Sequence, residues 1–250
     1  MTTRIPAVSG KFYPEEKDEL SLMLSAFFEK TKEKPNDSLH GIIVPHAGYI
    51  YSGQIAAHAY RLVSKKFTKV IILGPNHTVY TNGIVIDSNE YWETPLGKVK
   101  VEDLNITFNQ ESLPHEQEHS IEVQIPFLQY ILNDFTITPI VIGDINDLSS
   151  NTAAKKIIEK MDDETLLIIS TDLSHFYPAQ IAKSLDKRTI ETIKSLDMSM
   201  PIDACGIHPI EILMQICKIK KWDINLVEYG TSEETSGDAT SVVGYASFWF

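Results

Sequence analysis

The sequence predicts an α/β fold, namely a single domain over residues 1–250 with a mainly parallel central sheet flanked by helices. Two observations predict this fold. Short apolar runs rich in β-branched residues recur along the chain, and longer segments of helical period lie between them. Strands that are apolar along their whole length are typical of parallel sheets, because helices cover both faces of such sheets. No internal repeat or low-complexity segment marks a domain boundary.

Four apolar runs are the strongest candidates for strands of the parallel core. They cover residues 41–44, 70–73, 136–142 and 166–169. Runs of this length that are bounded by Gly, Pro or Ser are typical of buried strands. Further strands are predicted at residues 83–87, 99–101, 224–229 and 242–250, with a turn at residues 94–97.

Segments of helical period predict the helices that cover the sheet. They comprise residues 53–64, 151–161, 178–196 and 208–220. A further helix is expected to begin at Ser120, whose hydroxyl can cap the first turn, and to bend at Pro126, which lacks an amide proton. The alternation of these helices with the strands favours one layer of helices on each face of the sheet.

The charge and the cysteine content exclude several classes of protein. Lys and Arg number 22 against 34 Asp and Glu, and the formal net charge of -12 argues against binding to nucleic acid or to anionic membranes. No apolar run is long enough for a membrane helix, and the first residues lack the apolar core of a signal peptide. Two cysteines are too few for a disulfide framework. We therefore expect a cytoplasmic protein.

Three histidines follow directly after predicted strands. They are His46 in VPHAGY, His77 in LGPNH and His175 in STDLSH. Open α/β sheets bind their ligands at the carboxyl ends of the strands, so a shared site for the three imidazoles is the favoured interpretation. The alternative is that polar residues, histidine included, are simply common in loops.

Two of these imidazoles and one oxygen ligand would suit Fe(II), zinc, manganese or copper. A third imidazole held off the metal could act as a general acid or base. Asp172 precedes His175 by three residues and is a natural hydrogen-bond partner for it. The residues alone thus predict a metal-dependent site without selecting the metal.

Other residues are weaker candidates for the same site. His119 follows Glu118 at a predicted helix start, where it either lines the pocket or belongs to a helix cap. Cys205 is either a small buried residue or a pocket thiol. Residues 231–238 are rich in oxygen donors and form either a solvated turn or a pocket-lining loop. Neither a phosphate-binding glycine motif nor a nucleophile elbow is present.

Several motifs, in the same order along the chain, resemble those of the Memo family, which includes the animal mediator of cell motility and many archaeal and bacterial proteins. The matching segments are RIPAVSGKFYP at residues 4–14, PHAGYIYSG at 45–53, LGPNH at 73–77, EHSIE at 118–122, STDLSH at 170–175, CGIHPI at 205–210 and VGYA at 243–246.

The resemblance implies a fold similar to that of class III extradiol dioxygenases, which use non-haem Fe(II). It makes His46 and His77 the imidazole ligands of the metal and His175 the acid/base residue, with Asp172 beside it. Tyr51 and Phe12 would line the cleft, which in the animal protein has been linked to phosphotyrosine peptides. Fe(II) is the metal that the resemblance favours, with zinc and copper as alternatives.

The third ligand is the point at which the sequence is expected to depart from the family. The resemblance implies a cysteine ligand in the loop before the last strand of animal members, and that position corresponds to Thr235 here. Threonine is a poor metal ligand, so Asp238 or Glu234 is expected to replace it and to restore a two-histidine, one-carboxylate set. His175 moving onto the metal is the other option. The expected donors are therefore mainly nitrogen and oxygen.

Three functions are compatible with these residues. The first is a metal-dependent redox enzyme of dioxygenase type that acts on a small substrate. The second is a metal-dependent hydrolase that uses a metal-bound water. The third is a non-catalytic module that binds a peptide or small ligand in the same cleft. A small neutral or weakly acidic ligand is expected, because acidic residues such as Glu234 and Asp238 disfavour a strongly anionic one.

Overall fold

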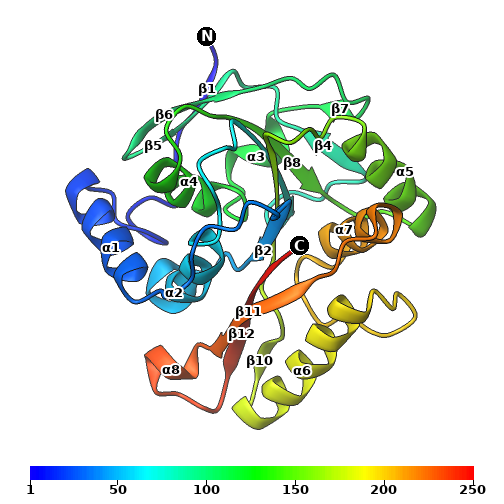
Figure 1. The fold of residues 1–250 in the computed structure, drawn as a ribbon. Coiled ribbons are helices and arrows are strands. Elements are labelled where there is room, and N and C mark those ends of the chain that lie inside the picture. Colours follow the sequence, from blue (N-terminus) through cyan, green and yellow to red (C-terminus); the bar gives the residue numbers. More distant parts are fainter.

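Four parallel strands form the centre of the sheet, in the order β8-β3-β9-β2. The computed structural model describes residues 1–250 (Figure 1). These strands span Gly41–Val44 (β2), Lys69–Pro75 (β3), Thr136–Ile142 (β8) and Thr165–Ser170 (β9). They are buried almost throughout, which confirms the strand positions predicted from the apolar runs. The mostly parallel sheet predicted from the sequence is thus observed.

Further strands, some parallel and some antiparallel, extend this centre on both sides. Strand β12 (Val242–Trp249) pairs with β2, and β10 (His175–Tyr177) and β11 (Asn225–Thr231) pair with β12. At the other side, β6 (Gly97–Val101) adds to β8, and β5 (Tyr91–Thr94) and β1 (Thr3–Arg4) follow it. Strand β4 (Ile84–Ile86) pairs with β8 and with β7 (Asn109–Gln110). The sheet therefore joins the first residues of the chain to the last.

Helices cover both faces of the sheet (Figure 1). One face carries α1 (Lys17–Glu29), α2 (Tyr49–Tyr60) and α4 (Ile125–Ile131), and the other carries α5 (Asp147–Ile158), α6 (Ala179–Ser195) and α7 (Ile207–Lys220). Consecutive strand residues serve the two layers alternately, because Ile42 packs in the first core and Ile43 in the second. None of these helices combines the length and apolar character that crossing a membrane requires.

The boundaries differ from the sequence prediction in a few places. Helix α2 begins at Tyr49, four residues earlier than expected, and α1 lies in a segment where no helix was predicted. The segment after Ser120 forms a short 3-10 helix, η1 (Glu122–Gln124), before α4. Pro126 lies in the first turn of α4 and not within a longer helix from Ser120, so its missing amide proton breaks no hydrogen bond of the helix. Two further short helices are α3 (Leu113–Glu116) and α8 (Glu233–Ser236).

Candidate metal centre

Three neighbouring strands bring the predicted site residues together at their carboxyl ends. Strand β9 lies between β3 and β2, so the loops that carry His77, Asp172 and His46 are adjacent. The register places Val44 beside Ser170, directly before His46 and Asp172. The ring centroids of His46 and His77 are 5.1 Å apart, and their planes are nearly perpendicular. The sheet order is therefore what unites these residues.

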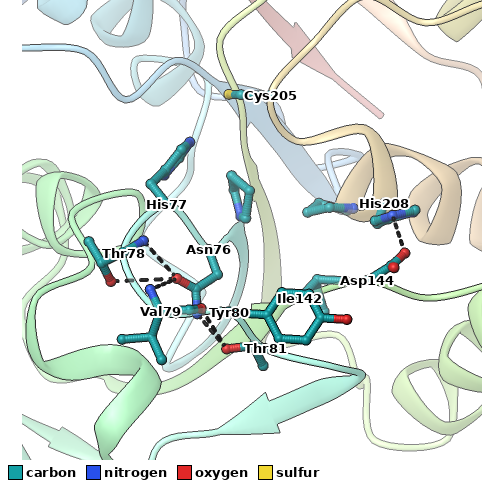
Figure 2. A pocket seen from close by; sticks show the side chains of 13 residues that line it. Asn76, His77, Thr78, Val79, Tyr80, Thr81, Ile142, Asp144, Cys205 and His208 are labelled. Carbon is teal, nitrogen blue, oxygen red and sulfur yellow. Dashed lines mark hydrogen bonds and ion pairs between the residues drawn. The ribbon is translucent and has the colours of Figure 1, made fainter.

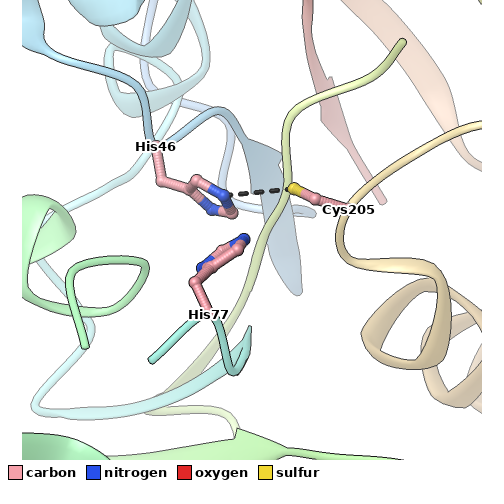
Figure 3. A group of neighbouring side chains, drawn as sticks. All are labelled: His46, His77 and Cys205. Carbon is pink, nitrogen blue, oxygen red and sulfur yellow. Dashed lines mark hydrogen bonds between the residues drawn. The ribbon is translucent and has the colours of Figure 1, made fainter. Parts of the chain in front are cut away.

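A thiol completes the group. Cys205 lies just before α7, and its Sγ is 3.1 Å from Nε2 of His46. Ligand atoms of His46, His77 and Cys205 all lie within 4.8 Å of one another (Figure 3). The sequence led us to expect mainly nitrogen and oxygen donors and no thiol ligand, and the geometry differs from that expectation. The sulfur comes from the loop between α6 and α7, and not from the loop before the last strand.

Backbone contacts fix the position of Cys205. Its amide donates to the carbonyl of Asp172 at 3.2 Å, and the amide of Asp172 donates to its Sγ at 3.2 Å. The amide of Gly206 donates to Oγ1 of Thr171 at 2.9 Å. A Cβ at Gly206 would lie 2.7 Å from the side chain of Thr171, so glycine permits this close approach. The loop is thus fastened to the end of β9.

Ser170 determines which nitrogen of His46 faces the thiol. Its hydroxyl donates to the carbonyl of Ser120 at 2.6 Å and lies 2.9 Å from Nδ1 of His46. Because the single hydroxyl proton is directed to Ser120, Ser170 can only accept from His46, so Nδ1 carries the proton. Nε2 then presents its lone pair towards Cys205. Gln124 reinforces this arrangement by donating to the same hydroxyl at 2.9 Å.

Glu118 holds His77 in the corresponding way. This buried carboxylate is 3.0 Å from Nδ1 of His77 and also accepts from the backbone amide of His77. It takes two further hydrogen bonds from the amides of His119 and Ser120, at 2.9 and 2.8 Å. Burial alone would raise the pKa of Glu118, but the hydrogen bonds and the charge of His77 lower it to about 2. Glu118 therefore stays ionised and keeps Nε2 of His77 free.

Ligand atoms of His77, Glu118 and His119 also lie close to one another. The carboxylate of Glu118 is already occupied by four hydrogen bonds, so we assign it to orienting His77 and not to binding a second metal. His119 lies beside the first group, with its ring centroid 4.7 Å from that of His77 and 5.4 Å from that of His46. The sequence prediction that His119 lines this site is consistent with that position.

The electrostatics of the group differ between its nitrogen and sulfur atoms. Burial, followed by repulsion from the imidazoles of His77, His119 and His175, lowers the pKa of His46 well below its usual value. His46 is therefore neutral at pH 7, which is the form that binds a metal. Burial and the nearby carboxylate of Asp172 raise the pKa of the Cys205 thiol to about 12. A metal would have to displace this proton.

Asp172 and His175 belong to the segment that follows β9. Oδ1 of Asp172 accepts from the amide of His46 at 2.8 Å. Burial raises the pKa of Asp172 to about 6, although the hydrogen bond from His46 and the charge of His175 lower it. His175 is half-buried at the start of β10, where the next residue, Phe176, has a φ of 64°. The bulge at this position breaks the regular pairing of β10 with β12.

The remaining predicted residues fall into two groups. Phe12 packs against His119 with ring centroids 4.7 Å apart, and Tyr51 is 40% exposed. A Cβ at Gly48, two residues after His46, would lie 3.6 Å from the carbonyl oxygen of Phe12 and 3.8 Å from the ring of Tyr51, so both residues lie close to the loop that carries His46. Thr235 and Asp238 are exposed in the α8 region, and neither belongs to a group of converging ligand atoms.

Sequence reasoning missed the residues that orient the ligands, namely Ser170, Gln124 and Glu118. Ser170 directly follows the strand predicted at residues 166–169, and Glu118 stands beside a candidate histidine, so both positions carried a signal. Gln124 carried none, because it is buried in the short helix η1 and contacts the site only through the fold.

The fold and this group of histidines and thiol define an α/β protein with a candidate metal centre at the carboxyl ends of its parallel strands. The family model of Memo-like proteins matches residues 4–249. A MEMO1 family protein of Methanobrevibacter smithii is 37% identical over 276 residues, which cover 98% of each chain. A MEMO1 family protein of Aquifex aeolicus is 35% identical over 271 residues, which cover 100% of each chain. The chain belongs to the Memo family.

Proposed function

We propose that this protein is a metal-dependent oxidoreductase that acts on a small molecule. A redox-active divalent metal would be held by His46, His77 and Cys205. The observation that carries the proposal is the convergence of three ligand atoms within 4.8 Å of one another. Two of them are imidazole nitrogens whose partner nitrogens are occupied by Ser170 and Glu118. Orientation of ligating histidines by such partners is typical of metal sites.

The distances and the chemistry of the donors fit a metal ion. Tetrahedral nitrogen and sulfur ligands at about 2.1 and 2.3 Å from a metal lie about 3.6 Å apart. The separation of 3.1 Å between Nε2 of His46 and Sγ of Cys205 is shorter than this value, so the two side chains would move slightly apart to admit a metal. Imidazole suits iron, copper and zinc, while thiolate favours copper and zinc. Fe(II) is our first candidate and copper the second, because both can support redox chemistry.

The protein residues would divide the work between binding and proton transfer. When bound, such a metal supplies open coordination positions and one-electron chemistry towards O2 and a substrate. Glu118 and Ser170 would hold the orientation of the imidazoles through hydrogen bonds to their Nδ1 atoms. His175 would exchange a proton with the substrate as a general acid or base, and its charge interacts with that of the buried Asp172. Phe12 and Tyr51 would border the cleft.

Metal analysis of protein purified without oxygen tests this proposal. We expect one iron or copper ion per chain in the wild type and none in His46→Ala or His77→Ala, with folding checked by circular dichroism. Loaded wild-type protein should consume O2 in the presence of catechol-type compounds. His175→Gln should retain the metal and lose most of this activity, because it removes only the proton-transfer group.

Two other outcomes would replace the proposal. Stoichiometric zinc without O2 consumption would indicate a hydrolase or another Lewis-acid enzyme. Failure to bind iron, copper or zinc at pH 7 to 8 would refute both the oxidoreductase and the hydrolase. A cleft that binds a peptide or small ligand without chemistry would then remain.

A further inference from the structure

A cavity of about 450 Å³ lies directly beside the candidate metal centre. It is lined by residues 75–81, by residues 142–144 and by Cys205, His208 and Pro209. Figure 2 shows His77 on one side of this cavity and Asp144 with His208 on the other. Its volume is in the range of pockets that bind small molecules. The cavity includes Cys205, which was predicted to line the cleft, but neither Phe12 nor Tyr51 belongs to its lining.

The loop that forms one wall of the cavity is held in place by its own polar groups. Oδ1 of Asn76 accepts from the amides of Thr78 and Val79, both at 3.0 Å, and its amide nitrogen donates to Oγ1 of Thr81 at 2.6 Å. The carbonyl of Thr81 in turn accepts from the amide of Asp144 at 3.0 Å. These groups shape the cavity and are no longer available to a ligand.

The polar groups that remain available are acidic or neutral. Asp144 is 73% exposed, and its only ion-pair partner is Nε2 of His208 at 3.8 Å. Nδ1 of His208 is 2.9 Å from a second carboxylate, that of Glu211. Two carboxylates thus share one imidazole, and no lysine or arginine lines the cavity. With a chain charge of -12, the local field favours a cation over an anion.

We propose that this cavity binds a small amine, with its ammonium group at Asp144 and His208 and a short aromatic or apolar body directed towards His77 and Cys205. Val79, Ile142 and Pro209 supply apolar walls for that body. Only one part of this inference rests on the proposed function, namely that the amine is the substrate of the metal centre. Binding of the amine itself requires Asp144 and not the metal. The expected ligand is therefore cationic at one end, unlike the neutral or weakly acidic ligand predicted from the sequence.

Three probes of similar size and different charge test this inference. Tyramine carries an ammonium group, 2-(4-hydroxyphenyl)ethanol is neutral, and 4-hydroxyphenylacetate is anionic. Dissociation constants are measured by ligand-observed NMR on the full chain, once without metal and once after zinc loading. Zinc is chosen because it does not oxidise phenols. We expect tyramine to bind at least about threefold more tightly than the alcohol, as one partly exposed ion pair allows. The acid should bind most weakly.

Matched variants assign the preference to Asp144. Asp144→Asn should bind tyramine and the alcohol equally, with the affinity for the alcohol unchanged. Asp163→Asn is the control, because this exposed acid lies just before β9, at the opposite end of the sheet. It should keep the preference of the wild type. Added salt should weaken the preference, because Asp144 is mostly exposed.

The inference is overturned if tyramine does not bind, if the acid binds as tightly as tyramine, or if Asp144→Asn keeps the preference. These results are independent of the metal. A preference for tyramine in a protein that takes up no metal would refute the proposed oxidoreductase and leave the amine site standing. Uptake of metal without a preference for tyramine would refute the amine site and leave the proposed oxidoreductase standing.

Discussion

The carboxyl ends of β2, β3 and β9 and the region around α8 both present side chains that could bind metals, but they hold them differently. In the first region, His46 and His77 are fixed from behind by Ser170 and Glu118, and one nitrogen of each remains free. In the second, Oδ1 of Asp238 accepts from the amide and the hydroxyl of Thr240, at 2.8 and 2.6 Å.

The arrangement of the donor atoms distinguishes a candidate metal site from an ordinary polar turn. In the first region His46 is buried, Cys205 is half-buried and the side chain of His77 is 30% exposed, and their hydrogen bonds leave ligand atoms close to one another. Those of the α8 region are exposed and satisfy one another, as in an ordinary turn. The first region offers imidazoles and a thiol and the second offers carboxylates and hydroxyls, but both contain residues that can bind metals, so the convergence of the donor atoms is what separates them. Four changes test this comparison.

Loss of a ligand in the buried group should have the largest effect. Cys205→Ser should weaken metal binding by more than about 100-fold. Substitution of a residue that only orients a ligand weakens binding by up to about 100-fold, and loss of a ligand should cost more. The thiolate would be replaced by a hydroxyl that is a poor ligand. Asp238→Asn in the α8 region should leave the affinity unchanged. Competition with a chromophoric chelator measures both variants, and equal losses would refute the distinction between the two regions.

The next largest effect concerns the buried ion pair that supports the first region. Arg4 and Glu122 are 2.7 Å apart and almost fully buried, and Arg4 also donates to the carbonyl of Glu118 at 2.7 Å. Glu122→Gln would leave a buried guanidinium without its counter-charge, and should lower the free energy of unfolding by about 3–5 kcal/mol. Urea unfolding measures this change.

The matched control for Glu122 is the exposed pair of Lys183 and Glu233, which joins α6 to α8 at 3.0 Å. Lys183→Gln should cost less than about 1 kcal/mol, because solvent screens the pair. A cost for Glu122→Gln as small as that for Lys183→Gln would show that the ion pair of Arg4 contributes little to stability.

A smaller effect is expected from the residue that orients His77. Glu118→Gln should weaken metal binding by about 10–100-fold, because the neutral amide holds Nδ1 of His77 less firmly. Glu234→Gln, at an exposed carboxylate in α8, is the control and should not change the affinity. The same titrations with chelator distinguish the two. If Glu118→Gln binds the metal as tightly as the wild type, Glu118 does not orient His77 for metal binding.

The smallest effect is a dependence of stability on pH that arises from His115. Burial disfavours the charged imidazole and lowers the pKa of His115 from 6.5 to about 4. Between these values the unfolded chain binds more protons than the folded chain, so the free energy of unfolding decreases as the pH falls. The loss between pH 7 and pH 5 amounts to about 2 kcal/mol for this residue.

His115→Gln should remove that part of the pH dependence, whereas Asp238→Asn in the exposed region should keep the dependence of the wild type. Urea unfolding at both pH values measures the difference. If the free energy of unfolding of His115→Gln falls between pH 7 and pH 5 by as much as that of the wild type, the imidazole of His115 is not held neutral by its burial.

Much of the fold was predictable because its signals are local. The apolar runs at residues 41–44 and 166–169 correspond to β2 and β9, and the helical period of residues 178–196 corresponds to α6 at Ala179–Ser195. Helix α1 was missed although Leu20, Leu24 and Phe28 follow a helical spacing on its buried face. Its capping residue makes no side-chain hydrogen bond, so the usual start signal is absent.

The positions of His46, His77 and His175 after strands of a mainly parallel sheet follow from the sequence, because apolar runs and the residues after them are local features. The contact of Cys205 with His46, which is 159 residues away along the chain, arises only in the folded protein. The order of β3, β9 and β2 and the contacts of Gly206 with Thr171 set that neighbourhood. Local periodicity encodes elements, whereas the convergence of donor atoms depends on how distant loops pack on the finished sheet.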